Sequence, residues 1–188
     1  LTTSRVQVPL SHVAIDGEEI PIPLQGKVTE GKGWVLRNSK GQYTLTLDGL
    51  KAGSLERKTP ALEIQGDLTL VLKKGTESEL LSTDAALKKG AGTLTIRGEG
   101  SLRLQGETAL EGEWKEETLN QDEPSALRIE GGKLVFTGEE TALYEDTVEL
   151  AGGEIQIQCL NGKGTGIRAH TLDDRHFSGS LEMEESEE

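Results

Sequence analysis

Gly92-Thr-Leu-Thr-Ile-Arg-Gly-Glu-Gly-Ser-Leu-Arg-Leu-Gln-Gly106 is the stretch that decides the fold. Aliphatic and polar residues alternate on both sides of its central glycines, and a period of two is typical of half-buried β-strands. Glycine begins, divides and ends the stretch, and glycine readily adopts the backbone angles of sharp turns. The stretch therefore predicts two short strands joined by a tight bend.

The same pattern recurs along the chain. Alternating segments occur at residues 44–48, 67–72, 133–137 and 155–157, and a glycine precedes almost every one. The 188 residues include 24 glycines, well above the usual share of roughly 7%. Helical periodicity is nearly absent. We therefore predict an all-β protein in which turns, not helices, connect the strands.

The alternating segments form a repeat. Ala61-Leu, Ala86-Leu and Ala126-Leu each begin a segment that continues with glycine and then Leu-x-(Leu/Ile/Phe). Equivalent aliphatic positions lie 23, 26 and 21 residues apart, with one gap of 40, for the pairs Leu45/Leu68, Leu68/Leu94, Leu134/Ile155 and Leu94/Leu134. A period of about 20–26 residues predicts a single-stranded parallel β-helix, or β-solenoid, of about four to six coils. Its core would consist of stacked aliphatic side chains.

The two ends differ from the repeat. Residues 1–32 contain two strand-like segments around Asp16-Gly17, with prolines suited to a sheet edge, and we predict an N-terminal β cap. Residues 33–181 would form the coils. An acidic insertion without alternation, at about 107–124, would protrude from one coil, and residues 182–188 would be a disordered acidic tail.

The charge excludes several classes of partner. The formal net charge is −13, and it is lopsided: +2 for residues 1–60, −4 for 61–120 and −11 for 121–188. A polyanion repels nucleic acid and anionic membrane surfaces, so neither is an expected partner. No stretch approaches the 18 or so consecutive apolar residues of a membrane span. The chain begins at Leu1 without a charged, apolar leader, and we expect a mature or trimmed fragment.

Several segments resemble a known family. Gly33-Trp-Val-Leu-Arg-Asn-Ser-Lys-Gly-Gln-Tyr-Thr-Leu-Thr-Leu-Asp-Gly-Leu50 is similar to the opening of a repetitive β-helix domain of bacterial cell-surface proteins. Residues 68–80 and 92–106 are similar to its first two coils, and the resemblance covers roughly residues 5–170. The family is the clostridial-type carbohydrate-binding β-helix group, with pectate-lyase-like architecture. The resemblance implies an extracellular or cell-surface module that binds acidic polysaccharide and calcium without catalysis. It assigns no site residue.

Catalysis is not predicted from the residues. Asp173-Asp174 is the only Asp-Asp pair, and the companion motifs of polygalacturonases are missing, so a polar turn is the preferred interpretation. A lyase needs a basic side chain beside calcium, and Lys88-Lys89, Arg97 and Arg103 are the candidates. Solvated lysines on a solenoid face explain them more simply.

Calcium is the one candidate cofactor. It takes six to eight oxygen ligands, which carboxylates on adjacent turns can supply. The densest acidic pairs are Asp122-Glu123, Glu139-Glu140 and Glu145-Asp146, although none follows a known calcium-loop motif. The alternative is an acidic surface without a metal.

Two aromatic residues are the candidates for sugar binding. Trp114 lies inside the acidic insertion and Tyr144 lies in a turn, whereas Trp34 and Tyr43 fit the cap and the first coil. A sugar platform is one interpretation of Trp114, and a ring that folds back onto its own loop is the other. Cys159 alternates with isoleucines, which predicts a buried, inert thiol.

Together these features predict a non-catalytic extracellular module that binds polysaccharide or cell-wall glycan, with calcium bridging an acidic glycan to the acidic protein. Two alternatives stay open. A structural or adhesive spacer would bind no glycan and would interact through its faces or ends. A degenerate polysaccharide lyase or hydrolase would cleave polyuronate.

Overall fold

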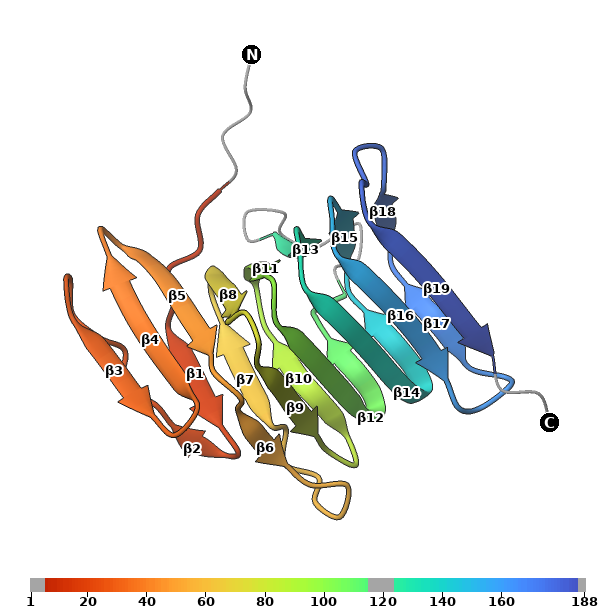
Figure 1. The fold of residues 1–188 in the computed structure, drawn as a ribbon, viewed down its shortest axis with the longest axis horizontal. Helices are drawn as coiled ribbons and strands as arrows, with labels where there is room; N and C mark the ends of the chain where they lie inside the picture. The colour runs from red at the N-terminus through yellow and green to blue at the C-terminus, as the bar shows by residue number, and fades with distance from the viewer. Residues whose placement is uncertain (1–5, 115–123, 186–188) are drawn as a thin grey trace.

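The computed structural model describes residues 6–114 and 124–185, and they form nineteen β-strands and no helix. The strands build a β-solenoid of about five turns, which confirms the predicted fold class. In Figure 1 the coils stack side by side in chain order, from the N-terminal strands at the left to the C-terminal strands at the right. No helix that could cross a membrane occurs in these residues.

Each coil passes through three faces. The first face belongs to the eight-stranded sheet, and its parallel strands are β5 (Gln42–Leu47), β8 (Leu68–Leu72), β11 (Gly92–Gly98), β13 (Ser125–Ile129), β15 (Thr147–Leu150) and β18 (Thr171–Asp173). Leu45, Leu70, Ile96, Ile129 and Leu150 lie above one another on this face and are buried.

The other two faces belong to the eleven-stranded sheet. The second face contains β6 (Lys51–Gly53), β9 (Glu77–Leu81), the first halves of β12 (Ser101–Glu111) and β14 (Lys133–Tyr144), β16 (Glu154–Cys159) and β19 (Ser180–Glu185). The third face contains β7 (Leu62–Gln65), β10 (Ala85–Lys89), the second halves of β12 and β14, and β17 (Thr165–Arg168). The register between β12 and β14 shifts after Gly106. A Cβ at Gly106 would lie 2.4 Å from the Asp84 carbonyl, so the strand bends closely past its neighbour there.

Antiparallel strands close the N-terminal end. Strand β1 (His12–Ile15) pairs with β7 and with β2 (Glu18–Glu19), while β3 (Val28–Gly31) and β4 (Trp34–Ser39) extend the first face beyond β5. Asp16 and Gly17 both have positive φ angles, 52° and 81°, as a two-residue hairpin turn requires. The antiparallel pairing continues through β4 and β5 to Leu47, past the predicted boundary at residue 32.

The predicted repeat is present, but the three aligned Ala-Leu segments do not all lie on the same face of the solenoid. On the third face the buried leucines Leu62, Leu87, Leu110 and Leu143 stack in register. Ala126-Leu127 is not part of this ladder, because Leu127 pairs with Leu94 on the first face. The apparent 40-residue gap has two causes. Leu94 lies on the first face and Leu134 on the second, and this coil is itself longer, since the partner of Leu94 on the next coil is Leu127, 33 residues away.

Two predicted irregular segments contain strand residues. Residues 107–111 of the predicted insertion belong to β12, and residues 115–123 lie outside the described residues. Residues 182–185 of the predicted disordered tail belong to β19, which pairs in parallel with β16, while residues 186–188 are outside the description. Both segments were predicted to be irregular because they are highly charged, and the charge does not prevent these residues from pairing as strands.

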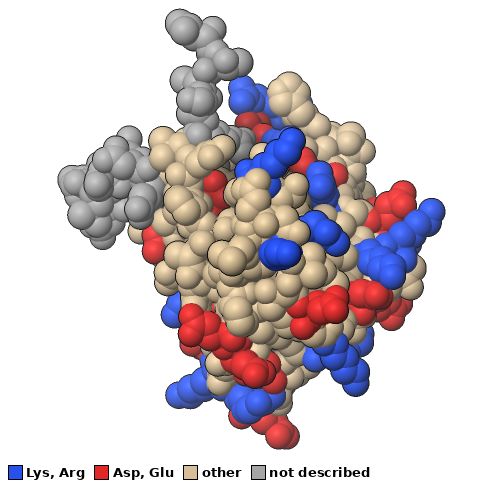
Figure 2. Space-filling view, turned by 90° about the vertical axis from the view of Figure 1, so that its left-hand side faces the viewer, with Lys and Arg blue, Asp and Glu red and all other residues tan. Residues whose placement is uncertain are grey.

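The charge gradient of the sequence becomes a gradient along the solenoid, because the coils stack in chain order. Figure 2 shows the N-terminal end, where basic and acidic side chains occur together. Lys27, Arg37 and Lys40 are exposed in this region, beside Glu18 and Glu30. The acidic residues of the described segment 124–185 therefore lie toward the C-terminal coils.

Candidate functional site

Four of the candidate residues, Trp114, Tyr144, Glu145 and Asp146, lie along one corner of the solenoid, where the third face of each coil turns into the first face of the next coil. We call it the third-to-first corner. Lys88, Glu111, Tyr144 and Arg168 stack in register at the ends of β10, β12, β14 and β17. The predicted insertion leaves the solenoid here, between β12 and β13.

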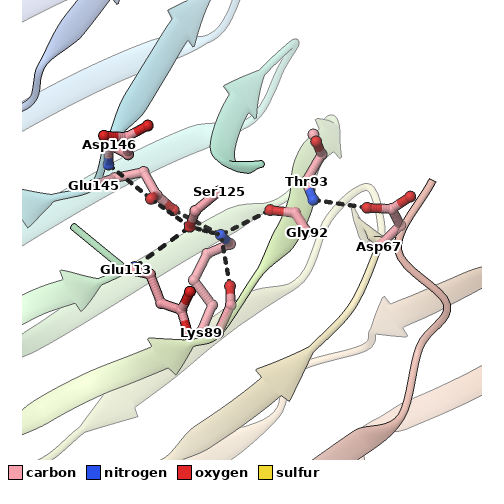
Figure 3. A network of polar contacts seen from close by, with 9 residues as sticks. Asp67, Lys89, Gly92, Thr93, Glu113, Ser125, Glu145 and Asp146 are labelled. Atoms are coloured by element: carbon pink, nitrogen blue, oxygen red, sulfur yellow. Dashed lines mark hydrogen bonds and ion pairs between the residues drawn. The ribbon is translucent and has the colours of Figure 1, made fainter. Parts of the chain in front are cut away.

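A buried ion pair lies directly inside this corner (Figure 3). The side chains of Lys89 and Glu145 are 1% and 0% exposed, and Lys89 Nζ lies 2.7 Å from Glu145 Oε2. Lys89 Nζ also donates to Ser125 Oγ (2.9 Å) and to the carbonyls of Gly92 (2.9 Å) and Gly90 (3.1 Å). Three N–H donors that face four oxygen atoms suit the ammonium form of the lysine.

The glutamate is equally well bonded. Its Oε1 accepts hydrogen bonds from Ser125 Oγ at 2.7 Å and from the Asp146 backbone N–H at 2.8 Å. Among the described residues, no buried side-chain nitrogen or oxygen atom lacks a partner. Gly112 leaves the space for this carboxylate, since a Cβ there would lie 2.2 Å from Glu145 Oε2.

Burial shifts both ionisable groups of the pair. Loss of hydration raises the pKa of the Glu145 carboxyl and lowers the pKa of the Lys89 ammonium, because each charged form loses contact with water. Their mutual attraction opposes both shifts, and the hydrogen bonds from Ser125 and Asp146 also oppose the rise in the pKa of Glu145. The ion pair is therefore a costly group to bury, and removal of one partner would leave an uncompensated charge.

The two predicted sugar-binding residues lie together at the outside of the same corner. The ring centroids of Trp114 and Tyr144 are 5.2 Å apart with a tilt of 31°. The Arg168 guanidinium lies 5.4 Å from the Trp114 ring centroid and 5.7 Å from that of Tyr144. Both rings are half-buried, and Arg168 is exposed. The site thus combines aromatic surface with a cation that can donate several hydrogen bonds.

Two members of this cluster, Arg168 and His170, were not predicted from the sequence. His170 packs against Trp114, with ring centroids 3.5 Å apart, and its Nδ1 lies 2.5 Å from Asp146 Oδ1. Arg168 is the direct neighbour of Tyr144 on the next coil. A 24-residue step from Tyr144, which falls within the predicted period, identifies Arg168. Sequence spacing contains no comparable signal for the contact between Trp114 and His170.

The four predicted calcium ligands within the described residues have separate partners or positions. The Glu145 carboxylate binds Lys89, Asp146 contacts His170, and Glu140 accepts a hydrogen bond from Asn161 Nδ2 at 3.0 Å. Glu139 lies in β14, and Asp122 and Glu123 lie outside the described residues. In residues 6–114 and 124–185, no three or more histidine, cysteine or acidic side chains are arranged to hold a metal ion.

Two grooves flank the corner. One has a volume of about 710 Å³, and Val8, Asp67 and Thr93 are among its lining residues. The Asp67 carboxylate accepts hydrogen bonds from the Val8 N–H (3.1 Å) and the Thr93 N–H (2.8 Å). Thr69 and Thr95 also line this groove. The other, of about 320 Å³, lies along the third face and includes His12, Lys88 and Glu113 among its lining residues.

The remaining predicted residues have structural surroundings. Trp34 is 9% exposed and belongs to the core, and Cys159 is buried. The Asp173 carboxylate accepts hydrogen bonds from Arg175, which lower the pKa of Asp173 to about 2. Lys89, a candidate lyase base, is enclosed in the ion pair and is not accessible to a polymer.

Three comparisons with known proteins gave one match. Searches among curated proteins and among solved structures found no match. One family model, described as carbohydrate-binding domain-containing protein, matches residues 11–186. This match covers nearly the whole solenoid, including the third-to-first corner. The chain therefore belongs to the family of carbohydrate-binding domain-containing proteins.

Proposed function

We propose that this protein is a non-catalytic module that binds polysaccharide at the third-to-first corner, with Trp114 and Tyr144 as the sugar platform. The observation that carries the proposal is the approach of these two rings to 5.2 Å, beside the exposed Arg168. Membership of a carbohydrate-binding family supports it. The protein would act outside the cell, on a cell-surface or cell-wall glycan.

The chemistry of the corner suits a sugar. Aromatic rings offer a rigid apolar surface for the C–H groups of a pyranose, and half-buried rings need little further ordering. The guanidinium of Arg168 is a planar set of donors that matches hydroxyl and carboxylate oxygen atoms. The arrangement therefore suits a sugar that bears a carboxylate, such as a uronate.

An acidic glycan must overcome repulsion from a protein of net charge −13. Arg168 supplies a positive charge at the platform itself, so direct contact with the carboxylate is the preferred mechanism. A bridging calcium ion is the alternative. The two mechanisms differ in their response to EDTA, which would abolish calcium-bridged binding and leave arginine-mediated binding unchanged.

The test is isothermal titration of polygalacturonate and of a neutral glucan, each with calcium and with EDTA. Trp114→Ala should weaken binding by about tenfold, which corresponds to the loss of one good aromatic contact. Arg168→Gln should weaken binding of polygalacturonate more than binding of the neutral glucan. Lys74→Gln is the matched control, because Lys74 is 81% exposed and lies in a turn away from this corner. Wild-type binding of neither polymer, or equal binding by the Trp114 variant, would refute the proposal.

A spacer function has one specific observation in its favour. The last coil exposes ladder residues that earlier coils bury: Leu172 is 48% exposed, Leu181 36% and Met183 55%. They continue the ladders of Val148, Ile155 and Ile157. Self-association through this end, measured by light scattering, together with an absence of glycan binding, would favour the spacer.

A further inference from the structure

The buried ion pair has hydrogen bonds that lead directly to the aromatic site. Lys89 comes from the second coil, at the end of β10, whereas Ser125 and Glu145 flank the fourth coil, at the ends of β13 and β14. The three side chains therefore connect non-adjacent coils behind the corner (Figure 3). We call them the Lys89–Ser125–Glu145 unit.

One arm of this unit reaches the residue before Trp114. Ser125 Oγ accepts a hydrogen bond from the Glu113 backbone N–H at 3.4 Å, while the same hydroxyl donates to Glu145 Oε1 and accepts from Lys89 Nζ. Next to it, the Gly112 N–H donates to the Tyr144 carbonyl at 2.6 Å. The backbone N–H groups of the two residues before Trp114 are thus both hydrogen-bonded, one to Tyr144 and one to Ser125.

The second arm reaches the other side of the Trp114 ring. Glu145 Oε1 accepts from the Asp146 N–H at 2.8 Å, and the Asp146 carboxylate contacts His170 Nδ1 at 2.5 Å. The His170 ring then packs against Trp114 at a centroid distance of 3.5 Å. Two independent routes from one buried carboxylate therefore converge on the indole.

Stability alone does not explain such a unit. Replacement of a buried ion pair by apolar side chains of similar volume is often neutral or stabilising, because the charges no longer lose hydration. An aliphatic pair at these positions would continue the solenoid core, which is otherwise made of aliphatic side chains. An apolar pair would not, however, hold the Asp146 N–H or the Ser125 hydroxyl in place.

We infer that the Lys89–Ser125–Glu145 unit positions Trp114 for ligand binding, so that Lys89 and Glu145 determine glycan affinity although neither contacts the ligand. This inference rests on the proposed function at the same site. The unit acts as a preformed support: it orders the indole before the glycan arrives, and the complex then forms with a smaller loss of conformational entropy.

The test uses Trp34→Phe as the parent, because Trp114 is then the only tryptophan in the chain. K89M/E145L removes the charges, the acceptor of the Asp146 N–H and the two side-chain bonds that hold the Ser125 hydroxyl. K89M/E145Q keeps an amide oxygen that can accept from the Asp146 N–H. We expect K89M/E145L to lose the near-ultraviolet circular dichroism of Trp114 and about tenfold in affinity for polygalacturonate, since the indole must then be ordered on binding. Its urea midpoint should stay close to the parent's, and K89M/E145Q should restore most of both signals.

The control is Ser78→Ala, which removes a buried hydroxyl that accepts from the Leu50 N–H at 3.1 Å, away from the third-to-first corner. It should lower stability without a change in the Trp114 signal. Should K89M/E145L fail to fold, Ser125→Ala removes the first arm alone and must still reduce the Trp114 signal. Parent-like Trp114 dichroism in folded K89M/E145L, or in Ser125→Ala, would overturn the inference. Failure of the parent to bind any glycan would refute the proposed function instead, because the dichroism is measured without ligand.

Discussion

Gly112→Ala should destabilise the protein through a single contact. The new Cβ would lie 2.2 Å from Glu145 Oε2, 2.3 Å from its Cδ and 2.5 Å from its Oε1. A carboxylate at the end of a free side chain would simply move away. Glu145 does not have this freedom, because Lys89, Ser125 and the Asp146 N–H hold both of its oxygen atoms.

The magnitude follows from the two ways in which the contact can relax. Overpacking of a core costs about 1–3 kcal/mol, and separation of a buried ion pair costs about 3–5 kcal/mol. We therefore expect a loss of about 3 kcal/mol, the value at which the two ranges meet. With a urea m-value of about 2 kcal/mol/M, the midpoint of unfolding should fall by about 1.5 M.

The assay is equilibrium urea unfolding followed by circular dichroism, with Gly90→Ala as the matched control. Gly90 lies at the same corner one coil earlier, and its nearest contact for a new Cβ is the flexible Gln65 Cγ at 3.1 Å. Neither glycine has a positive φ angle, so backbone strain does not separate the two variants. A Gly112→Ala midpoint equal to that of Gly90→Ala would show that Glu145 is not fixed as described.

Three further predictions concern other parts of the solenoid. Phe136 is fully buried between Leu104 and Ile157. In urea unfolding, Phe136→Ala should lower the free energy of unfolding by about 3–5 kcal/mol and Phe136→Leu by under about 1.5 kcal/mol. Equal losses in the two variants would argue against a tightly packed ladder. Hydrogen bonds from Arg175 lower the pKa of Asp173 to about 2, from an ordinary value of 3.8. The Asp173 carboxylate therefore stabilises the fold above pH 3.8, and this stabilisation is lost as the pH falls toward 2. In Arg175→Ala, carboxyl titration by NMR should return this pKa toward 3.8, and an unchanged value would contradict the assigned hydrogen bonds. Cys159, 5% exposed, should react with a thiol reagent only after unfolding, and rapid labelling of the native protein would contradict its burial.

Much of the fold is predictable from local pattern. Alternation in residues 92–106 identifies two strands, and their spacing identifies a solenoid, because both properties depend on residues that are close in the chain. The assignment of strands to faces is not local. Ala126-Leu127 and Ala109-Leu110 look alike in sequence, yet they belong to different faces because the register of neighbouring coils decides the stacking.

The binding site divides in the same way. The sequence alone identified Trp114 and Tyr144 as the aromatic residues outside the core pattern, but it could not indicate that they meet. It also named Glu145 as a candidate calcium ligand or a surface acid, and it interpreted Lys89 as a solvated base. Only the tertiary structure joined them, because Lys89 and Glu145 are 56 residues apart and meet through the stacking of coils. Local pattern determined the strands and the aliphatic ladders of this protein, whereas long-range packing decided which charged groups are buried and which rings form a surface.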